Sequence, residues 1–259
     1  MALLTIHYYA KSIQMASILQ VVLPEQALYS PDRPLPVVLL LSPEGAEGAW
    51  WLRHCRLEHL SERRNVAFVL VPCLQGCHCD MAYGYRFAQV VEQDIPAWLD
   101  RNLPLLSTKG QWWIAGCSMG GTGALRTALL HPERYAGTAS FWGRLSHREN
   151  VEHPLPGDYL TPRRLHQLYG TDPAALTGTD MDLLALLNRA ADSAPTLHLC
   201  TGQGQPGYAS NLQFVRRAQA LGYPCTLVEA AALPEDALEA QLSTFLNKIC
   251  PGEEASSCP

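Results

Sequence analysis

Residues 112–125 read WWIAGCSMGGTGAL, and this stretch decides how the chain is interpreted. The apolar run over 112–115 predicts a buried strand, and residues 122–130 have the composition of a helix. Between them, residues 116–120 match the pattern G-x-S-x-G, with Ser118 at its centre. A serine held at a sharp strand-to-helix turn presents its hydroxyl group above the sheet, beside the N-terminus of the helix. Backbone N–H groups and the helix dipole favour a developing negative charge there.

The residues next to Ser118 fit such a turn. Gly116 and Gly120 lie two residues before and two after the serine, where side chains would clash in a strained turn. Met119 follows the serine and would offer its backbone N–H to an oxyanion. We therefore predict that Ser118 occupies a nucleophile position. The alternative is a glycine-rich turn without chemistry.

The rest of the chain alternates short apolar runs with amphipathic segments. Pro36–Leu41 and Val66–Val71 are continuously apolar, which is typical of strands buried on both faces. Ala49–Arg64 has helical spacing, and a helix over Phe87–Leu103 is expected to kink or split at Pro96. The other expected elements are strands over Ser12–Leu23, Gln111–Cys117, Thr138–Trp142, Thr196–Cys200 and Cys225–Val228, and helices over Gly121–Leu130, Ser210–Leu221 and Leu238–Ile249. This order predicts an α/β fold, a mostly parallel sheet with helices on both faces.

We expect a single domain over residues 1–250. Residues 143–193 interrupt the alternation with four prolines and two short helical patterns, and we interpret them as an insertion over one end of the sheet. Residues 251–259 are small and polar and are expected to form a flexible tail.

Composition excludes several classes of protein. With 47% hydrophobic residues and a net charge of −5, the chain is too apolar for a disordered protein. Its 19 basic residues are scattered among 24 acidic ones, which argues against a nucleic-acid surface. Apolar runs such as Val37–Leu41 fall far short of the roughly 20 residues that cross a membrane. The first ten residues do not resemble a signal peptide, so the nine cysteines are expected to be reduced thiols in the cytoplasm.

The turn and its helix, residues 116–125, resemble those of the putative-esterase family. This is the group of α/β-hydrolases that includes tributyrin esterases and S-formylglutathione hydrolase (esterase D). Shorter similar segments are Asp80–Arg86, Asp94–Leu99, His131–Tyr135, Tyr169–Asp172 and Asp180–Leu183. The resemblance extends from about Tyr8 to Leu246. It implies an α/β-hydrolase fold descended from serine esterases, a small-molecule ester or acyl ligand, and no cofactor.

The resemblance also implies an acid and a histidine after the serine, and here the sequence departs from the family. A serine is a weak nucleophile unless an imidazole accepts its proton and an acid orients that imidazole. The acid position falls at about Gln205, within Thr201–Gly207, which contains no carboxylate. The histidine position falls near residues 232–236, which read ALPED, and no histidine follows His198.

The expected oxyanion loop also differs. Family members carry His-Gly after the strand that corresponds to Pro36–Leu41, whereas this chain has Ser42-Pro43. The next residue, Glu44, retains a backbone N–H that could pair with that of Met119 as a second oxyanion donor. Its carboxylate would oppose a second negative charge if it pointed inward.

Another histidine could replace the missing base. His78 is the best candidate, because the loop over residues 73–80 follows a strand at the same end of the sheet as Ser118; the alternative is a histidine in a surface loop. His198 lies within a strand and is expected in the core. The insertion, whose placement the sequence does not fix, carries His147, His153 and His166.

The cysteines around His78 do not predict a metal site. Cys73, Cys77 and Cys79 do not have the spacing of a common zinc framework, and adjacent ligands can hardly all reach one tetrahedral ion. We expect reduced thiols near the pocket.

Three hypotheses follow. The first is an esterase-family protein that retains Ser118 but is impaired or inactive as an esterase. The second is an active small-acyl carboxylesterase with a substitute base such as His78. The third is a non-catalytic protein that binds a ligand or a partner.

Overall fold

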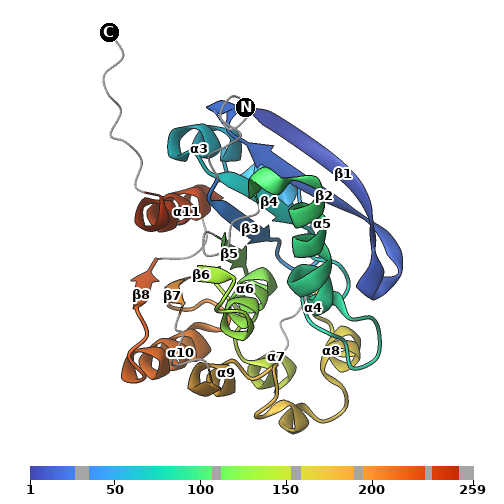
Figure 1. Ribbon diagram of the computed structural model, residues 1–259. Coiled ribbons are helices and arrows are strands. Elements are labelled where there is room, and N and C mark those ends of the chain that lie inside the picture. Colours follow the sequence, from blue (N-terminus) through green and yellow to red (C-terminus); the bar gives the residue numbers. More distant parts are fainter. Residues whose placement is uncertain (27–34, 107–111, 153–158, 190–194, 231–234, 251–259) are drawn as a thin grey trace.

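The computed structural model describes residues 1–26, 35–106, 112–152, 159–189, 195–230 and 235–250. Eight strands form one sheet in the order β1-β2-β4-β3-β5-β6-β7-β8 (Figure 1). Their bounds are β1 Ala2–Ala10, β2 Met15–Leu23, β3 Val37–Leu41, β4 Ala67–Val71, β5 Trp112–Cys117, β6 Tyr135–Phe141, β7 Thr196–Thr201 and β8 Cys225–Glu229. From β4 to β8 all neighbours are parallel, while β1 and β2 form an antiparallel hairpin whose second strand pairs antiparallel with β4. The prediction of a mostly parallel sheet is confirmed.

Helices cover both faces of this sheet (Figure 1). Their bounds are α2 Trp50–His54, α3 Leu57–Arg64, α4 Phe87–Gln89, α5 Ile95–Asn102, α6 Met119–Leu130, α7 His147–Glu152, α8 Pro162–Tyr169, α9 Leu183–Arg189, α10 Tyr208–Ala220 and α11 Glu235–Ile249, with short turns η1 Lys11–Ile13, η3 Pro104–Leu106 and η4 Pro173–Leu176 and a π-helical turn η2 Val90–Asp94. Helices α5, α6, α9 and α10 pack on one face, and α2, α3 and α11 pack on the other. No helix in the described part of the chain is long and apolar enough to cross a membrane.

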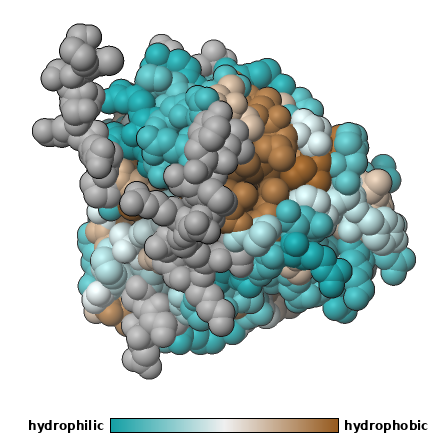
Figure 2. Space-filling model, turned by 45° about the horizontal axis from the view of Figure 1, so that its top comes forward, coloured by the Kyte–Doolittle hydropathy of each residue, from teal (hydrophilic) through white to brown (hydrophobic). Residues whose placement is uncertain are grey.

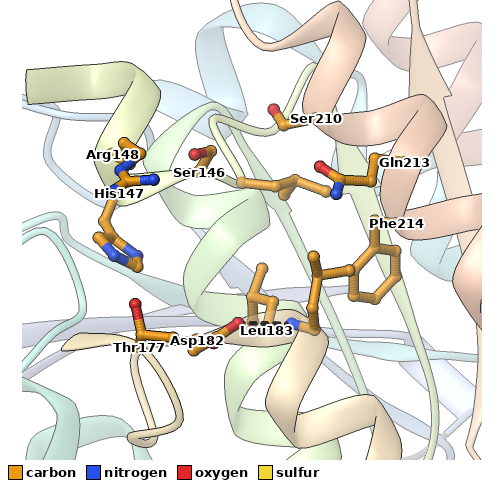
Figure 3. Close-up of a pocket in the computed structure, with 11 residues that line it drawn as sticks. Ser146, His147, Arg148, Thr177, Asp182, Leu183, Ser210, Gln213 and Phe214 are labelled. Carbon is orange, nitrogen blue, oxygen red and sulfur yellow. Dashed lines mark hydrogen bonds between the residues drawn. The ribbon is translucent and has the colours of Figure 1, made fainter. Parts of the chain in front are cut away.

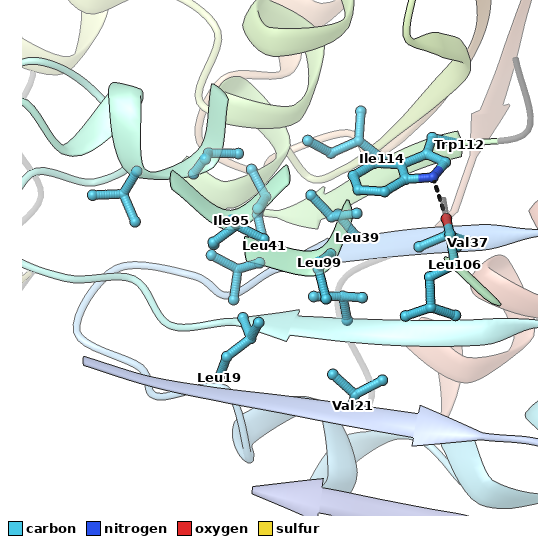
Figure 4. Packing of buried hydrophobic residues seen from close by; sticks show 14 of the residues in the cluster. Leu19, Val21, Val37, Leu39, Leu41, Ile95, Leu99, Leu106, Trp112 and Ile114 are labelled. Carbon is cyan, nitrogen blue, oxygen red and sulfur yellow. Dashed lines mark hydrogen bonds between the residues drawn. The ribbon is translucent and has the colours of Figure 1, made fainter. Parts of the chain in front are cut away.

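The two faces of the central strands explain the continuous apolar runs. In β3, Val37, Leu39 and Leu41 point toward α5, while Val38 and Leu40 point toward the opposite layer. Figure 4 shows the first set packed with residues of α5 and with Trp112 of β5. Since every residue of β3 is buried, no position in it tolerates a polar side chain without cost.

The hairpin differs from the expectation. Strand β2 begins at Met15 rather than at Ser12, and β1 was not expected at all. In β1 the exposed residues alternate with less exposed ones, a period of two that predicts a half-buried strand. Leu3 and Tyr9 stand on the exposed side, where their apolar character obscures this alternation in the sequence.

The helix expected over residues 87–103 is divided into α4, η2 and α5. Before Pro96, the N–H of Ile95 donates to the carbonyl of Val90, five residues back, as in a π-helix. Pro96 has no N–H to continue the regular pattern, so the irregular turn lies beside it. The helix expected over residues 49–64 is likewise divided at Cys55 into α2 and α3.

Between β6 and β7 the chain forms α7, α8, η4 and α9, the region expected as an insertion. Residues 153–158 and 190–194 of this segment, and the expected tail 251–259, lie outside the described residues.

A buried ion pair joins the helical layer to this segment. Arg126 of α6 contacts the Glu92 carboxylate, and its Nε donates to the carbonyl of Asp180 over 3.0 Å. His131 lies 3.7 Å from the same carboxylate. Burial would raise the pKa of Glu92, but the hydrogen bonds and charges of His131 and Arg126 outweigh burial and lower it.

Replacing Glu92 with Gln should lower the free energy of unfolding by about 3 kcal/mol at pH 7, because Arg126 then keeps an uncompensated buried charge. Urea denaturation measures this change. Glu133→Gln is the matched control, since Glu133 is exposed and contacts only His131 among these groups. Equal losses in the two variants would contradict a structural role for the buried pair.

Candidate active site

Ser118 stands at the turn between β5 and α6, with φ 52° and ψ −119°. Two close approaches of the backbone require glycine on either side. A Cβ atom on Gly116 would lie 2.1 Å from the carbonyl oxygen of Gly120, and one on Gly120 would lie 2.2 Å from that of Leu41. The turn is therefore held in a strained conformation with the partly exposed serine at its tip.

The turn lies where the parallel strands β3, β5 and β6 end. The N–H of Ser118 donates to the carbonyl of Phe141, the last residue of β6, over 2.9 Å. On the other side, the loop after β3 contains Glu44. The carboxyl ends of the strands in a parallel sheet are the usual place for a binding site in this kind of fold.

The carboxylate of Glu44 lies directly on the turn. Ser118 Oγ donates to Glu44 Oε1 over 2.9 Å, and the backbone N–H of Met119 donates to Glu44 Oε2 over 3.2 Å. The Glu44 side chain is 13% exposed. One carboxylate therefore contacts both the expected nucleophile and the N–H expected to stabilise an oxyanion.

A buried arginine lies beside this carboxylate. Arg144 Nη1 is 3.9 Å from Glu44 Oε1, and the Arg144 side chain is 6% exposed. Its Nε donates to Asn150 Oδ1 over 3.0 Å, and its carbonyl accepts from Thr122 Oγ1 over 2.9 Å. The opposite charge of Arg144 makes it less costly to keep the Glu44 carboxylate away from water.

His78 takes up a different position from the one needed by a base. It is buried, and its Nε2 lies 2.9 Å from the carbonyl oxygen of Ser42. Helix α6 passes directly over it, because a Cβ atom on Gly123 would lie 2.6 Å from His78 Cβ. Burial lowers the pKa of His78 to about 4, so the ring is neutral at pH 7. The structure does not bring His78 into contact with Ser118.

The other histidines weighed from the sequence are engaged elsewhere. His147 Nε2 lies 3.1 Å from the carbonyl oxygen of Pro173, and His166 is exposed beside Tyr83. His198 is buried in β7, as expected, 3.4 Å from Lys248 Nζ. His153 lies outside the described residues. In the described part of the chain, no histidine is hydrogen-bonded to Ser118.

At the positions expected for the acid and the histidine, the structure describes Gln205 and the backbone of Glu235. After β7, Gln205 lies in a turn in which its N–H donates to the carbonyl of Gly202 over 3.0 Å. Of the segment 232–236, residues 232–234 lie outside the described part, and Glu235 begins α11.

The cysteines expected near the pocket are buried. Cys73 and Cys77 pack against Met119 in a cluster with residues of α8. The hydrogen bond with Cys73 and burial raise the pKa of Cys77, and burial raises that of Cys79 to about 12, so both are neutral thiols. No group in the described residues has the ligands to hold a metal ion.

A separate pocket of about 240 Å³ is lined by residues 145–148, which follow Arg144 in the chain, and by residues of α9 and α10. Figure 3 shows Gln213 and Phe214 of α10 facing His147 and Thr177 across it. Ser118 and Glu44 do not line it. Asp182 in its wall accepts the N–H groups of Leu184 and Ala185, and therefore caps α9. The carboxylate of Asp182 in the pocket wall is thus already engaged in the fold.

Comparison with known proteins fits this geometry. A family described as putative esterases matches residues 10–206. The chain belongs to this family. An acetyl esterase of Caldicellulosiruptor saccharolyticus is 25% identical over 219 residues, 78% of this chain and 80% of the relative.

Solved structures show the same α/β-hydrolase fold. The fluorophosphonate-binding serine hydrolase FphF of Staphylococcus aureus superposes with a TM-score of 0.85 at 20% identity, covering 96% of this chain and 98% of that one. An S-formylglutathione hydrolase of Staphylococcus aureus superposes with a TM-score of 0.83 at 20% identity, with the same coverage. The predicted fold and family are confirmed.

The position of His78 in this esterase-family chain generates a prediction about pH. Because its folded pKa is about 4 and the unfolded value is near 6.5, the unfolded state binds more protons between these values. The stability that the neutral ring contributes is therefore present above pH 6.5 and is lost as the pH falls toward 4. We expect His78→Asn to flatten this part of the stability curve, measured by urea denaturation from pH 7 to pH 4.5.

Asparagine is the suitable replacement, because His78 has φ 59° and asparagine tolerates that conformation. His198, also with a pKa near 4, is unchanged and contributes equally to both proteins. Parallel stability curves would show that His78 is not the buried neutral group described above.

Proposed function

We propose that this esterase-family protein retains the serine turn but is inactive, or severely impaired, as an esterase at Ser118. The contact of the Glu44 carboxylate with both Ser118 Oγ and Met119 N–H is the observation that carries the proposal. We further propose that any small acyl ligand at this site is bound without efficient turnover.

The first argument concerns the proton. Attack by a serine requires a base that accepts the hydroxyl proton and then returns it to the leaving group. The sequence has no histidine after His198, and no described histidine contacts Ser118. Glu44 accepts the hydroxyl hydrogen bond, but a carboxylate is a much weaker base than imidazole toward a serine hydroxyl.

The second argument concerns charge. Acyl transfer places a negative charge on the former carbonyl oxygen, and backbone N–H groups normally stabilise it. Here the Met119 N–H already donates to a carboxylate oxygen. A substrate oxygen would have to displace Glu44, or its developing charge would lie beside an existing one.

One competing function is favoured by a specific distance. At 2.9 Å from Ser118 Oγ, Glu44 is placed as a general base for an active esterase. That role conflicts with its second contact, because the same carboxylate occupies the Met119 N–H that the reaction would need. The other alternative, His78 as base, is supported by no contact in the described residues.

The proposal predicts that the wild-type protein and Ser118→Ala hydrolyse p-nitrophenyl acetate and p-nitrophenyl butyrate at the same background rate. The physical reason is that neither proton transfer nor oxyanion stabilisation is available at Ser118. Initial rates of p-nitrophenolate release measure this. Turnover at ordinary esterase rates that disappears in Ser118→Ala would defeat the proposal.

A second prediction separates a blocking carboxylate from a catalytic one. Glu44→Ala should label with an alkyl fluorophosphonate at least about tenfold faster than the wild type, because the Met119 N–H becomes free to stabilise the adduct. Labelling is followed by intact-protein mass spectrometry. Glu47→Ala is the matched control, since Glu47 lies in the same loop but is exposed and pairs with Arg53.

The double variant Glu44→Ala/Ser118→Ala should not label, which assigns the adduct to Ser118. If Glu44 is instead the base, Glu44→Ala labels more slowly than the wild type. The two roles of Glu44 therefore predict changes of opposite direction.

A further inference from the structure

Strand β1 forms one edge of the sheet in the part of the chain that the structure describes. It is the first strand of the sheet, and in the described residues it pairs only with β2. In a strand of nine residues, alternate N–H and C=O groups then point outward and can pair with another strand. Such an edge is a ready template for association with a second chain.

The β1 edge lacks the features that usually prevent an edge strand from pairing with another chain. Charged residues, proline, bulges or short length commonly prevent pairing of edge strands. The sequence of β1, ALLTIHYYA, contains no lysine, arginine, carboxylate or proline. Its register with β2 runs without a bulge from Ala2 opposite Leu23 to Ala10 opposite Met15. The other edge strand, β8, has only five residues and ends in Glu229.

Two of the four exposed side chains on the outer face of β1 are large and apolar. On the outer face of β1, Leu3 is 44% exposed and Tyr9 is 64% exposed, and Ile18 of β2 lies on the same face. Leu4 and Ile6 on the inner face are only partly buried. In Figure 1, β1 and β2 lie in the upper part of the molecule. Figure 2 turns this part toward the viewer and shows apolar surface there.

We propose that β1 pairs antiparallel with β1 of a second copy, so that one sheet continues across a symmetric dimer. A strand paired antiparallel with its own copy is related to it by a two-fold axis, and each copy uses the same edge. Assembly therefore closes at two chains. A second copy is the occupant because β1 carries no Lys, Arg, Asp or Glu that would repel an identical strand, and its apolar side chains can pack against those of the copy.

The charges at the two ends of β1 select the register. Lys11 is the only Lys, Arg, Asp or Glu within residues 2–23, and it follows the end of the strand. At the other end, the N-terminal ammonium group of Met1 lies 3.0 Å from Glu62 Oε1 and 3.8 Å from Glu25 Oε2, so two carboxylates face a single ammonium group there. An antiparallel pair that places Lys11 opposite Met1 brings its ammonium group toward these carboxylates.

This register has its two-fold axis at Ile6. It places Leu3 opposite Tyr9 of the second copy on the outer face and Leu4 opposite Tyr8 on the inner face. Cross-strand pairs of this kind, aromatic with aliphatic, stabilise antiparallel sheets. The same two-fold axis repeats each pair, so a single substitution changes the interface twice.

The test uses exposed side chains that the fold does not need. Sedimentation velocity of the wild type over a range of concentrations should show a monomer–dimer equilibrium. Leu3→Lys/Tyr9→Lys places two ammonium groups opposite each other at two sites and should raise the dimer dissociation constant at least about tenfold. Leu3→Lys/Tyr9→Glu places opposite charges at the same sites and should restore the dimer.

Ile18→Lys is the matched control. Ile18 is exposed on the same face, but it belongs to β2, the second strand from the edge, so the dimer should persist. Circular dichroism confirms that each variant is folded. A monomeric wild type, a dimer that survives the two lysine substitutions, or failure of the lysine–glutamate combination to restore it would each overturn the proposal. Open-ended assembly of the wild type would equally overturn a closed dimer.

Discussion

The close contact between the start of α6 and the end of β3 fixes the geometry of the whole site. Gly120 approaches the carbonyl of Leu41 so closely that any side chain there would overlap the backbone. The chain can therefore leave β5 only through the strained turn at Ser118, between the loop after β3 and the loop after β6. Glu44 contacts Ser118, and Arg144 lies beside Glu44, because these two loops follow the strands on either side of β5.

Two features that carry the proposal of an inactive serine turn support each other. A chain that lacks the histidine gains nothing from an open oxyanion site, because no base prepares the nucleophile. A free Met119 N–H would then be an unsatisfied donor, and the Glu44 carboxylate satisfies it together with the Ser118 hydroxyl. The nearby guanidinium of Arg144 offsets part of the cost of desolvating that carboxylate. The site is therefore a closed set of polar contacts within the chain itself.

The sequence was informative where the pattern reflects burial. Continuous apolar runs identified β3 and β4, and the glycines around Ser118 identified the turn, because both patterns record direct steric or solvation requirements. The sequence was less informative about whether a long polar side chain points into the solvent or into the interior. The Glu44 side chain lies beside Arg144, which is distant in sequence. The buried position of His78 was equally hard to predict, because its place under α6 depends on the absence of a side chain at Gly123.

Strand β1 was missed for a related reason, and the reason bears on assembly. The exposed positions of β1 are Leu3, Thr5, His7 and Tyr9, and two of these four residues are apolar, which weakens the alternation expected of a half-exposed strand. In the sheet order, β2, β4 and β3 separate β1 from β5. The proposed pairing through β1 would therefore place the second chain away from Ser118, and it would leave the contacts of the serine turn unchanged.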